Sequence, residues 1–123
     1  VQSSDIPEID QALKLNGHND SVSRVWDENQ DGSFDRFETM NVGGRELSVP
    51  VAESTEGSPF YTGILYVDSG SGFDGSESLV FVTEMQADTE GSYGTYDYEV
   101  RIPFSLGHQS GSEGKISIYS ELR

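Results

Sequence analysis

The chain has 123 residues, which is enough for one domain with a substantial hydrophobic core. Its net charge of −15 comes from 22 acidic and 7 basic residues, so we expect its surface to repel nucleic acids and anionic membranes. Cysteine is absent, which excludes disulfides and a cysteine nucleophile. No apolar run approaches the roughly 18 residues of a membrane span. The acidity is equally consistent with adaptation to high salt, where screening makes many surface carboxylates tolerable.

The chain begins with a polar, acidic stretch. Residues 1–10 are predicted to be an extended lead-in to the domain, and residues 12–15 to form a short strand. The first residue is Val1 rather than methionine, which we interpret as a processed end. A glycosylation-type sequon follows at 19–21. Together these features favour a secreted or cell-surface protein.

The most informative segment, residues 27–38, follows the only tryptophan. It places oxygen-bearing side chains at loop positions 1, 3, 5, 9 and 12, and a glycine at position 6. Calcium takes about six to eight oxygen ligands, which alternate residues of a tight loop can supply. Gly32 would allow the sharp turn, and Phe34 would anchor the loop in the core. The predicted metal ligands are Asp27, Asn29, Asp31, Ser33 through its carbonyl, Asp35 and Glu38.

This spacing resembles the calcium loops of EF-hand and dockerin proteins, and those of secreted β-domains with a Trp-Asp-x-Asn-x-Asp-Gly run. The resemblance implies Ca²⁺ as the cofactor. The flanks differ, because residues 21–26 are short and β-branched for an entering helix, and Gly43-Gly44 would soon stop an exiting one. No second copy of the loop is present. We therefore expect a calcium loop inserted into a β-protein; the alternative is an acidic turn that binds nothing.

The remaining chain has a β pattern. Apolar and polar residues alternate over 47–51, where Pro50 predicts an edge strand because it lacks an N–H. Residues 60–67 and 79–85 are apolar on both faces, which is typical of central strands. A last strand is expected over 115–122.

The clearest alternation runs from residue 96 to 106. The face predicted to be buried carries Tyr96, Tyr98, Val100, Ile102, Phe104 and Leu106, and the opposite face carries Asp97, Glu99, Arg101 and Ser105. With short spacings, glycine-rich turns and no good helix, the chain is predicted to be all-β. We expect a single domain over residues 1–123, a β-sandwich of six or seven antiparallel strands with the calcium loop inserted. A small β-barrel is the alternative.

Other candidate sites are weaker. A second calcium site could form from Asp68, Asp74 and Glu77, although their spacing fits no known motif. His18 and His108 have no zinc-ligand spacing. No Gly-x-Ser-x-Gly elbow is present, and a carboxylate pair means little among 22 acids, so we do not expect an enzyme.

Aromatic side chains are the remaining feature that could bind a partner. Sugar rings pack well against tyrosine and tryptophan. We assign Trp26, Tyr96 and Tyr98 to the core, and Tyr61, Tyr93 and Tyr119 to positions that could be exposed. Residues 6–10 and 98–104 are similar to the opening and the last core strand of CBM9-like carbohydrate modules.

The predicted function is a secreted, calcium-stabilised β-sandwich module with a structural or interaction role, such as an adhesive or filament component. Strands near the two termini would pair with a protein partner, including another copy of the chain. The alternative is a calcium-dependent carbohydrate-binding module, in which glycan hydroxyls complete the coordination of the metal.

Overall fold

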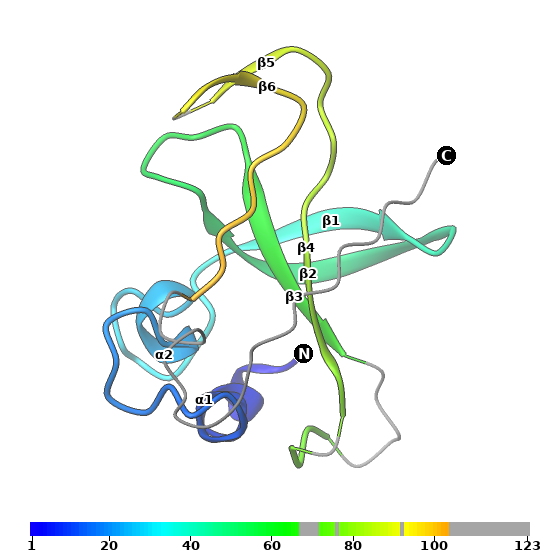
Figure 1. Cartoon of the computed structure of the whole chain (residues 1–123). Helices are drawn as coiled ribbons and strands as arrows, with labels where there is room; N and C mark the ends of the chain where they lie inside the picture. Colours follow the sequence, from blue (N-terminus) through cyan, green and yellow to red (C-terminus); the bar gives the residue numbers. More distant parts are fainter. Residues whose placement is uncertain (67–71, 76, 92, 104–123) are drawn as a thin grey trace, which may run out of the picture.

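The computed structural model describes residues 1–66, 72–75, 77–91 and 93–103, which form mostly strands with few helices (Figure 1). This agrees with the all-β class. Among these residues, no helix is long and apolar enough to cross a membrane. The elements in chain order are a 3-10 turn η1 (Ser3–Asp5), α1 (Ile6–Ala12), α2 (Val22–Val25), β1 (Phe37–Val42), β2 (Arg45–Glu53), β3 (Tyr61–Tyr66), β4 (Leu79–Val82), β5 (Thr89–Gly91) and β6 (Gly94–Tyr96).

The N-terminal segment is helical, so the extended lead-in expected over residues 1–10 is wrong. Pro7 lies in the first turn of α1, where its fixed φ suits the helix and its missing N–H is not needed. Ile6 and Ile9, one turn apart, are both buried and place this face of the helix in the core. The strand expected over 12–15 is also wrong, because these residues are the end of α1 and the turn after it.

Helix α2 is a single turn that the β-branched sequence of residues 21–26 did not predict. The buried side chain of Asp10 supplies its N-terminal cap from a distance of twelve residues along the chain. Asp10 Oδ1 accepts the N–H of Val22 at 2.6 Å, and Oδ2 accepts the N–H of Ser23 at 3.0 Å. A carboxylate at this end of a helix satisfies donors that lack an intrahelical partner. Tertiary capping therefore overrides weak local propensity.

The larger sheet has four antiparallel strands in the order β1-β2-β3-β4. β3 lies between two partners, which confirms the central strand predicted over 60–67. β2 lies between β1 and β3 in the strand order, so the edge position predicted from Pro50 is wrong for the strand as a whole, although residues 45–50 pair with β1 alone. The proline lies at a change of partner: Pro50 is opposite Phe37 of β1, and the next residue, Val51, is opposite Gly63 of β3. The second sheet is the two-stranded hairpin of β5 and β6.

Apolar side chains gather on both faces of the larger sheet. One cluster joins the helices to β2 and β3 and contains Ile6, Ile9, Val22, Val25, Trp26, Phe34, Ala52, Ile64 and Phe73. The other contains Met40, Val49 and Val51, with Tyr61, Leu65 and Val82 at its margin. Gly63 lies under this second cluster, where a Cβ would come within 2.5 Å of Val49 Cγ1. The larger sheet therefore packs against helices on its first face, and the described residues do not show the predicted sandwich of six or seven strands.

Residues 96–103 differ most from expectation. Only Gly94–Tyr96 forms a strand, and the face predicted to be buried is the exposed one: Tyr96 is 54% exposed and Tyr98 45%. Glu99, predicted to face solvent, is only 9% exposed. Asp97 and Arg101, which share the predicted face of Glu99, are exposed, so Glu99 is the exception on that face. A contact distant in sequence holds this segment, since Arg101 donates its N–H to Thr62 Oγ1 at 2.7 Å. Residues 104–106 and the strand predicted over 115–122 lie outside the described residues.

Candidate functional site

The predicted calcium loop lies between α2 and β1 and is fixed to the core at its base. The N–H of Asp35 donates to the carbonyl of Trp26 at 3.1 Å, which joins the two ends of the loop. Phe34 is 6% exposed within the first core cluster, which confirms its predicted role as an anchor. Its N–H also donates to Ser3 Oγ at 3.1 Å. The loop is therefore held from the sheet side and from the N-terminal segment.

Asp27 organises the first half of the loop. Its carboxylate is buried, and its two oxygens accept the N–H groups of Asp31 at 3.1 Å and Gly32 at 2.9 Å. Gly32 has φ of 86°, the left-handed conformation for which a glycine is expected at position 6. The sharp turn thus aims two backbone donors at one carboxylate, which stabilises its negative charge inside the protein.

The other polar side chains fold back over the same turn. Asn29 Oδ1 accepts the N–H of Asp31 at 2.9 Å, and Asp31 Oδ1 accepts the N–H of Ser33 at 2.9 Å. Asp35 Oδ1 accepts Asn29 Nδ2 at 2.7 Å, which links the two halves of the loop. A carboxylate or amide oxygen has a second lone pair, so these bonds leave capacity for a cation. The loop thereby brings Asp27, Asn29, Asp31 and Asp35 together.

Glu38, the predicted twelfth-position ligand, is placed differently. It lies in β1 opposite Val49 and is half-buried, beside a hollow that Tyr61 and Glu84 also line. Across the described ranges, no group of three or more histidine, cysteine, aspartate or glutamate side chains is arranged to hold a metal ion. The donor types and the Gly32 turn fit a calcium loop, and the closure by Glu38 stays a prediction.

Arg36, at a loop position that needs no ligand, ties the end of the loop to β2. Its guanidinium forms an ion pair with the carboxylate of Glu53 and lies 5.5 Å from the centroid of the Tyr61 ring. The hydrogen bond from Arg36 lowers the pKa of Glu53 below its usual value, and the same bond raises the pKa of Arg36. This pair is partly exposed, so its role is to orient the strand more than to stabilise it.

The weaker candidates are only partly described. Glu77 Oε2 accepts the N–H of Asp74 at 3.0 Å, a local turn contact, and Asp68 lies outside the described residues. His18 lies in an exposed turn, whereas His108 is not described. Of the tyrosines expected to be accessible, Tyr93 is 72% exposed, Tyr61 is half-buried and Tyr119 is not described.

Three buried carboxylates were not singled out from the sequence. Asp10 caps α2, and Asp5 accepts the N–H of Gln2 at 2.7 Å and the hydroxyl of Tyr66 at 3.1 Å. The signal for both was present, because each acid is next to an isoleucine that recurs with helical spacing. Glu99 is the third, and the period-two pattern around it indicated the opposite face.

In the loop of residues 27–35, four side chains with oxygen atoms accept hydrogen bonds from within the loop: Asp27, Asn29, Asp31 and Asp35. Such a set suits a hard cation better than zinc, which prefers nitrogen and sulfur ligands. Comparisons of this chain with protein-family models, with characterised proteins and with solved structures give no match.

Proposed function

We propose that this protein is a secreted or cell-surface β-domain stabilised by a calcium ion in the loop of residues 27–38, with a structural or interaction role. The supporting observation is the hydrogen-bond pattern of that loop, in which Asp27, Asn29 and Asp31 fold over the turn at Gly32. The finer fold that we propose is a β-sandwich of six or seven antiparallel strands.

Each ligand has a defined role in this proposal. Asp27, Asn29 and Asp31 supply the first half of the coordination sphere, and Ser33 supplies its carbonyl. Asp35 binds directly or through a water, and Glu38 closes the site from the start of β1. A net charge of −15 makes the metal-free chain repel itself, so a bound dication relieves part of that repulsion.

Binding of this kind contributes directly to folding. At a calcium concentration about 100-fold above the dissociation constant, linkage adds about 2.7 kcal/mol to the free energy of unfolding. Extracellular calcium sites bind with dissociation constants of about 10⁻⁴ to 10⁻³ M, which suits a secreted module in a calcium-rich medium. The ion therefore replaces the disulfides that this cysteine-free chain lacks.

The interaction role is supported by the edges of the larger sheet. In the described part of the chain, β1 and β4 are the outer strands of that sheet, and each has one hydrogen-bonded neighbour. An outer strand is the place in a sheet where a further chain can pair. Residues 1–10 are helical, so β1 and β4 replace the N-terminal segment as the proposed contacts. Sedimentation of the chain in calcium tests this role, and a monomer at high concentration would contradict self-assembly.

Thermal unfolding of matched loop variants tests the calcium proposal. Asp31→Asn removes one charge at a ligand position yet keeps the acceptor for Ser33, whereas Glu28→Gln removes one charge at a non-ligand position of the same loop. In calcium we expect Asp31→Asn to melt about 5 °C below the parent, because about 1 kcal/mol or more of linkage is lost. Glu28→Gln should melt with the parent.

The same melts in a chelator complete the experiment. All three proteins should then unfold at similar temperatures, because no ion distinguishes them. Calorimetric titration with calcium should show a weaker dissociation constant for Glu38→Gln by about tenfold, as loss of one ligand from a multidentate site implies. A parent protein whose melting temperature is the same in calcium and in chelator would refute the calcium proposal.

Carbohydrate binding is the second candidate, and the exposure of Tyr93 and Tyr96 favours it. Both rings belong to the β5–β6 hairpin, which lies at the top of Figure 1, well apart from α2 and the loop that follows it. A sugar on these rings would therefore not coordinate the calcium ion. The calcium-bridged mode expected from the sequence has less support than a separate sugar site.

A further inference from the structure

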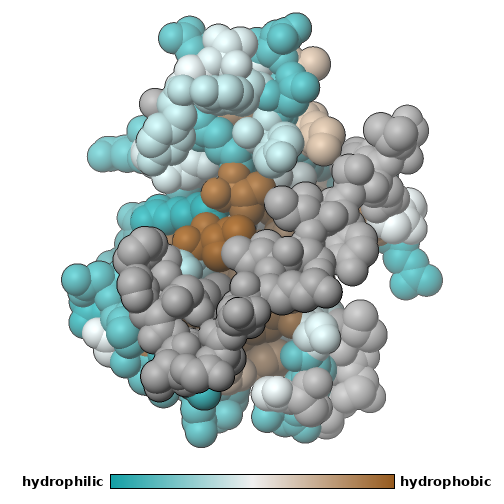
Figure 2. Space-filling model, in the orientation of Figure 1, coloured by the Kyte–Doolittle hydropathy of each residue, from teal (hydrophilic) through white to brown (hydrophobic). Residues whose placement is uncertain are grey.

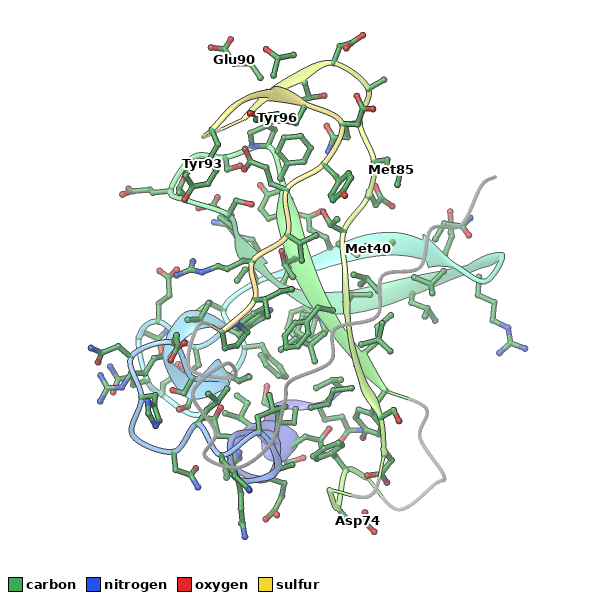
Figure 3. The ribbon with its side chains drawn as sticks, viewed as in Figure 1. Met40, Asp74, Met85, Glu90, Tyr93 and Tyr96 are labelled. Carbon is green, nitrogen blue, oxygen red and sulfur yellow. The ribbon has the colours of Figure 1, made fainter. Side chains whose placement is uncertain are left out.

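A hollow of about 480 Å³ lies between the β5–β6 hairpin and residues 99–102, which follow it in the chain, and Ser54, the residue after β2, also lines it. Its volume is within the range of small-molecule sites, about 300–1,000 Å³. Its polar lining comes from Ser54, Glu99 and Arg101, and its aromatic lining from Tyr93 and Tyr96. Figure 3 shows the two labelled tyrosines on the hairpin, on the side that faces the β2–β3 segment.

Two residues that line this hollow each carry a buried side-chain oxygen that has no partner. In the described ranges, three buried side-chain polar atoms lack a hydrogen bond, and two of them, Ser54 Oγ and Glu99 Oε2, belong to residues that line it. Glu99 is 9% exposed, and its other oxygen accepts the N–H of Tyr93 at 3.3 Å. Leaving buried acceptors unpaired destabilises a fold, so such atoms are usually paired by a ligand or by water.

The position of the Glu99 carboxylate depends on the absence of a side chain at Gly91. A Cβ at Gly91 would overlap Glu99 Oε1 and would come within 2.8 Å of the Phe60 ring. Only the absence of a side chain at Gly91 therefore allows this carboxylate to lie against the hairpin. The chain thus keeps a charged group at a buried place where a small residue makes room for it.

The aromatic lining is unusually exposed. Tyr93 is 72% exposed and Tyr96 is 54% exposed, and Val100 and Ile102 beside them are 40% and 38% exposed. Figure 2 shows apolar surface in the middle of this face, below the hydrophilic surface of the upper part of the molecule. Tyrosine rings offer an apolar face with a polar tip, which suits the C–H faces and the hydroxyls of a sugar.

The charges on the hollow select the class of ligand. Arg101, whose guanidinium donates to the Glu53 carbonyl at 3.1 Å, contributes further donors, whereas Glu99 and Ser54 contribute acceptors. A cation would meet Arg101, and an anion would meet Glu99 and a net charge of −15. Hydroxyl groups both donate and accept. We propose that the hollow binds a neutral saccharide, with Tyr93 and Tyr96 stacking on its ring and Glu99 and Ser54 accepting its hydroxyls.

This proposal deepens the second candidate function and does not depend on calcium in the loop. The test is calorimetric titration of the full chain, in calcium, with cellohexaose, xylohexaose and mannohexaose, and with a sialylated oligosaccharide and choline as charged comparisons. We expect at least one neutral hexasaccharide to bind with a dissociation constant below 1 mM. Neither charged compound should bind.

Matched variants locate the site. Tyr93→Ala and Glu99→Gln should each weaken binding at least tenfold, whereas Tyr98→Ala and Glu90→Gln should leave it unchanged. Tyr98 is a similarly exposed tyrosine and Glu90 an exposed carboxylate of β5, and neither lines the hollow. Circular dichroism checks that each variant is folded. Tyr93 is exposed, so Tyr93→Ala should stay folded and can decide the test even if Glu99→Gln unfolds.

A final arm separates this proposal from the calcium proposal. Asp31→Asn in calcium should bind the saccharide as tightly as the parent, since the loop does not contact the hollow. Loss of saccharide binding in folded Asp31→Asn would mean that the ion holds the sugar and would overturn the site proposed here. So would the absence of binding by all three neutral hexasaccharides, or equal binding by Tyr93→Ala and the parent.

Discussion

Buried carboxylates serve two different ends in this molecule. In the N-terminal part, Asp5, Asp10 and Asp27 each accept hydrogen bonds on both oxygens, mostly from backbone N–H groups. Beside the β5–β6 hairpin, Glu99 accepts one N–H on one oxygen, and its other oxygen has no partner. The first group holds the helices and the loop in place. The comparison teaches that burial of an acid alone does not indicate a site, because backbone donors can satisfy both oxygens of a buried carboxylate.

The largest expected effect on stability concerns the carboxylates that accept hydrogen bonds on both oxygens. Asp10→Ala removes the cap of α2 and leaves one buried and one partly buried donor unpaired, so we expect the free energy of unfolding to fall by about 2–3 kcal/mol. Urea unfolding monitored by circular dichroism measures this change. Glu8→Ala, on the exposed side of α1, is the control and should change stability by less than about 0.5 kcal/mol. Equal stability of the two variants would show that Asp10 does not hold α2.

The second prediction is a change in the free energy of unfolding of the opposite sign. Glu99→Gln removes a buried charge that lacks a full set of partners, so without ligand it should leave the protein equally stable or stabilise it by up to about 1 kcal/mol. The isosteric change Asp10→Asn, measured by the same urea unfolding, should destabilise it. Similar losses in both variants would remove the distinction between the two groups of carboxylates.

The smallest effect concerns a partly exposed acid, Glu53, that has an ion-pair partner. The pKa of Glu53 is lowered by its hydrogen bond from Arg36, so the ion pair stabilises the fold above the unfolded pKa of about 4.3 and this contribution is lost as pH falls through the lower, folded pKa. We expect less than about 1 kcal/mol, because the pair is partly exposed. Urea unfolding of the parent and of Glu53→Gln between pH 3 and 7 measures this contribution. The two free energies of unfolding should converge at acid pH, and a difference that does not change with pH would show that the ion pair does not stabilise the fold.

Features fixed by neighbours in sequence were predictable. The turn at Gly32, the anchor at Phe34 and the fold of Asp27 and Asp31 over the loop depend on contacts within a few residues, so spacing alone indicated them. The central strand β3 was recognisable because an apolar run on both faces requires cover on both sides. The same pattern at residues 79–85 also predicted a central strand, and there the prediction is wrong, because β4 is an outer strand of the described sheet.

Features fixed by distant contacts were not predictable. Nothing near α2 indicates that Asp10 caps it, and period two in residues 96–106 indicates alternation without saying which face is buried. In the folded chain both faces are largely exposed, and the segment is held by the contact of Arg101 with Thr62, 39 residues away. The hollow beside Glu99 was hidden for the same reason, since Ser54 and Tyr93 meet only in the folded chain.

The only tryptophan lies where the loop meets the sheet. Its carbonyl accepts the N–H of Asp35, its indole donates to the carbonyl of Thr62 at 3.1 Å, and its ring centroid is 6.0 Å from that of Phe81. Fluorescence emission excited at the red edge of protein absorption therefore arises from this one junction. The molecule contains its own optical reporter for events in the loop, with no label to attach.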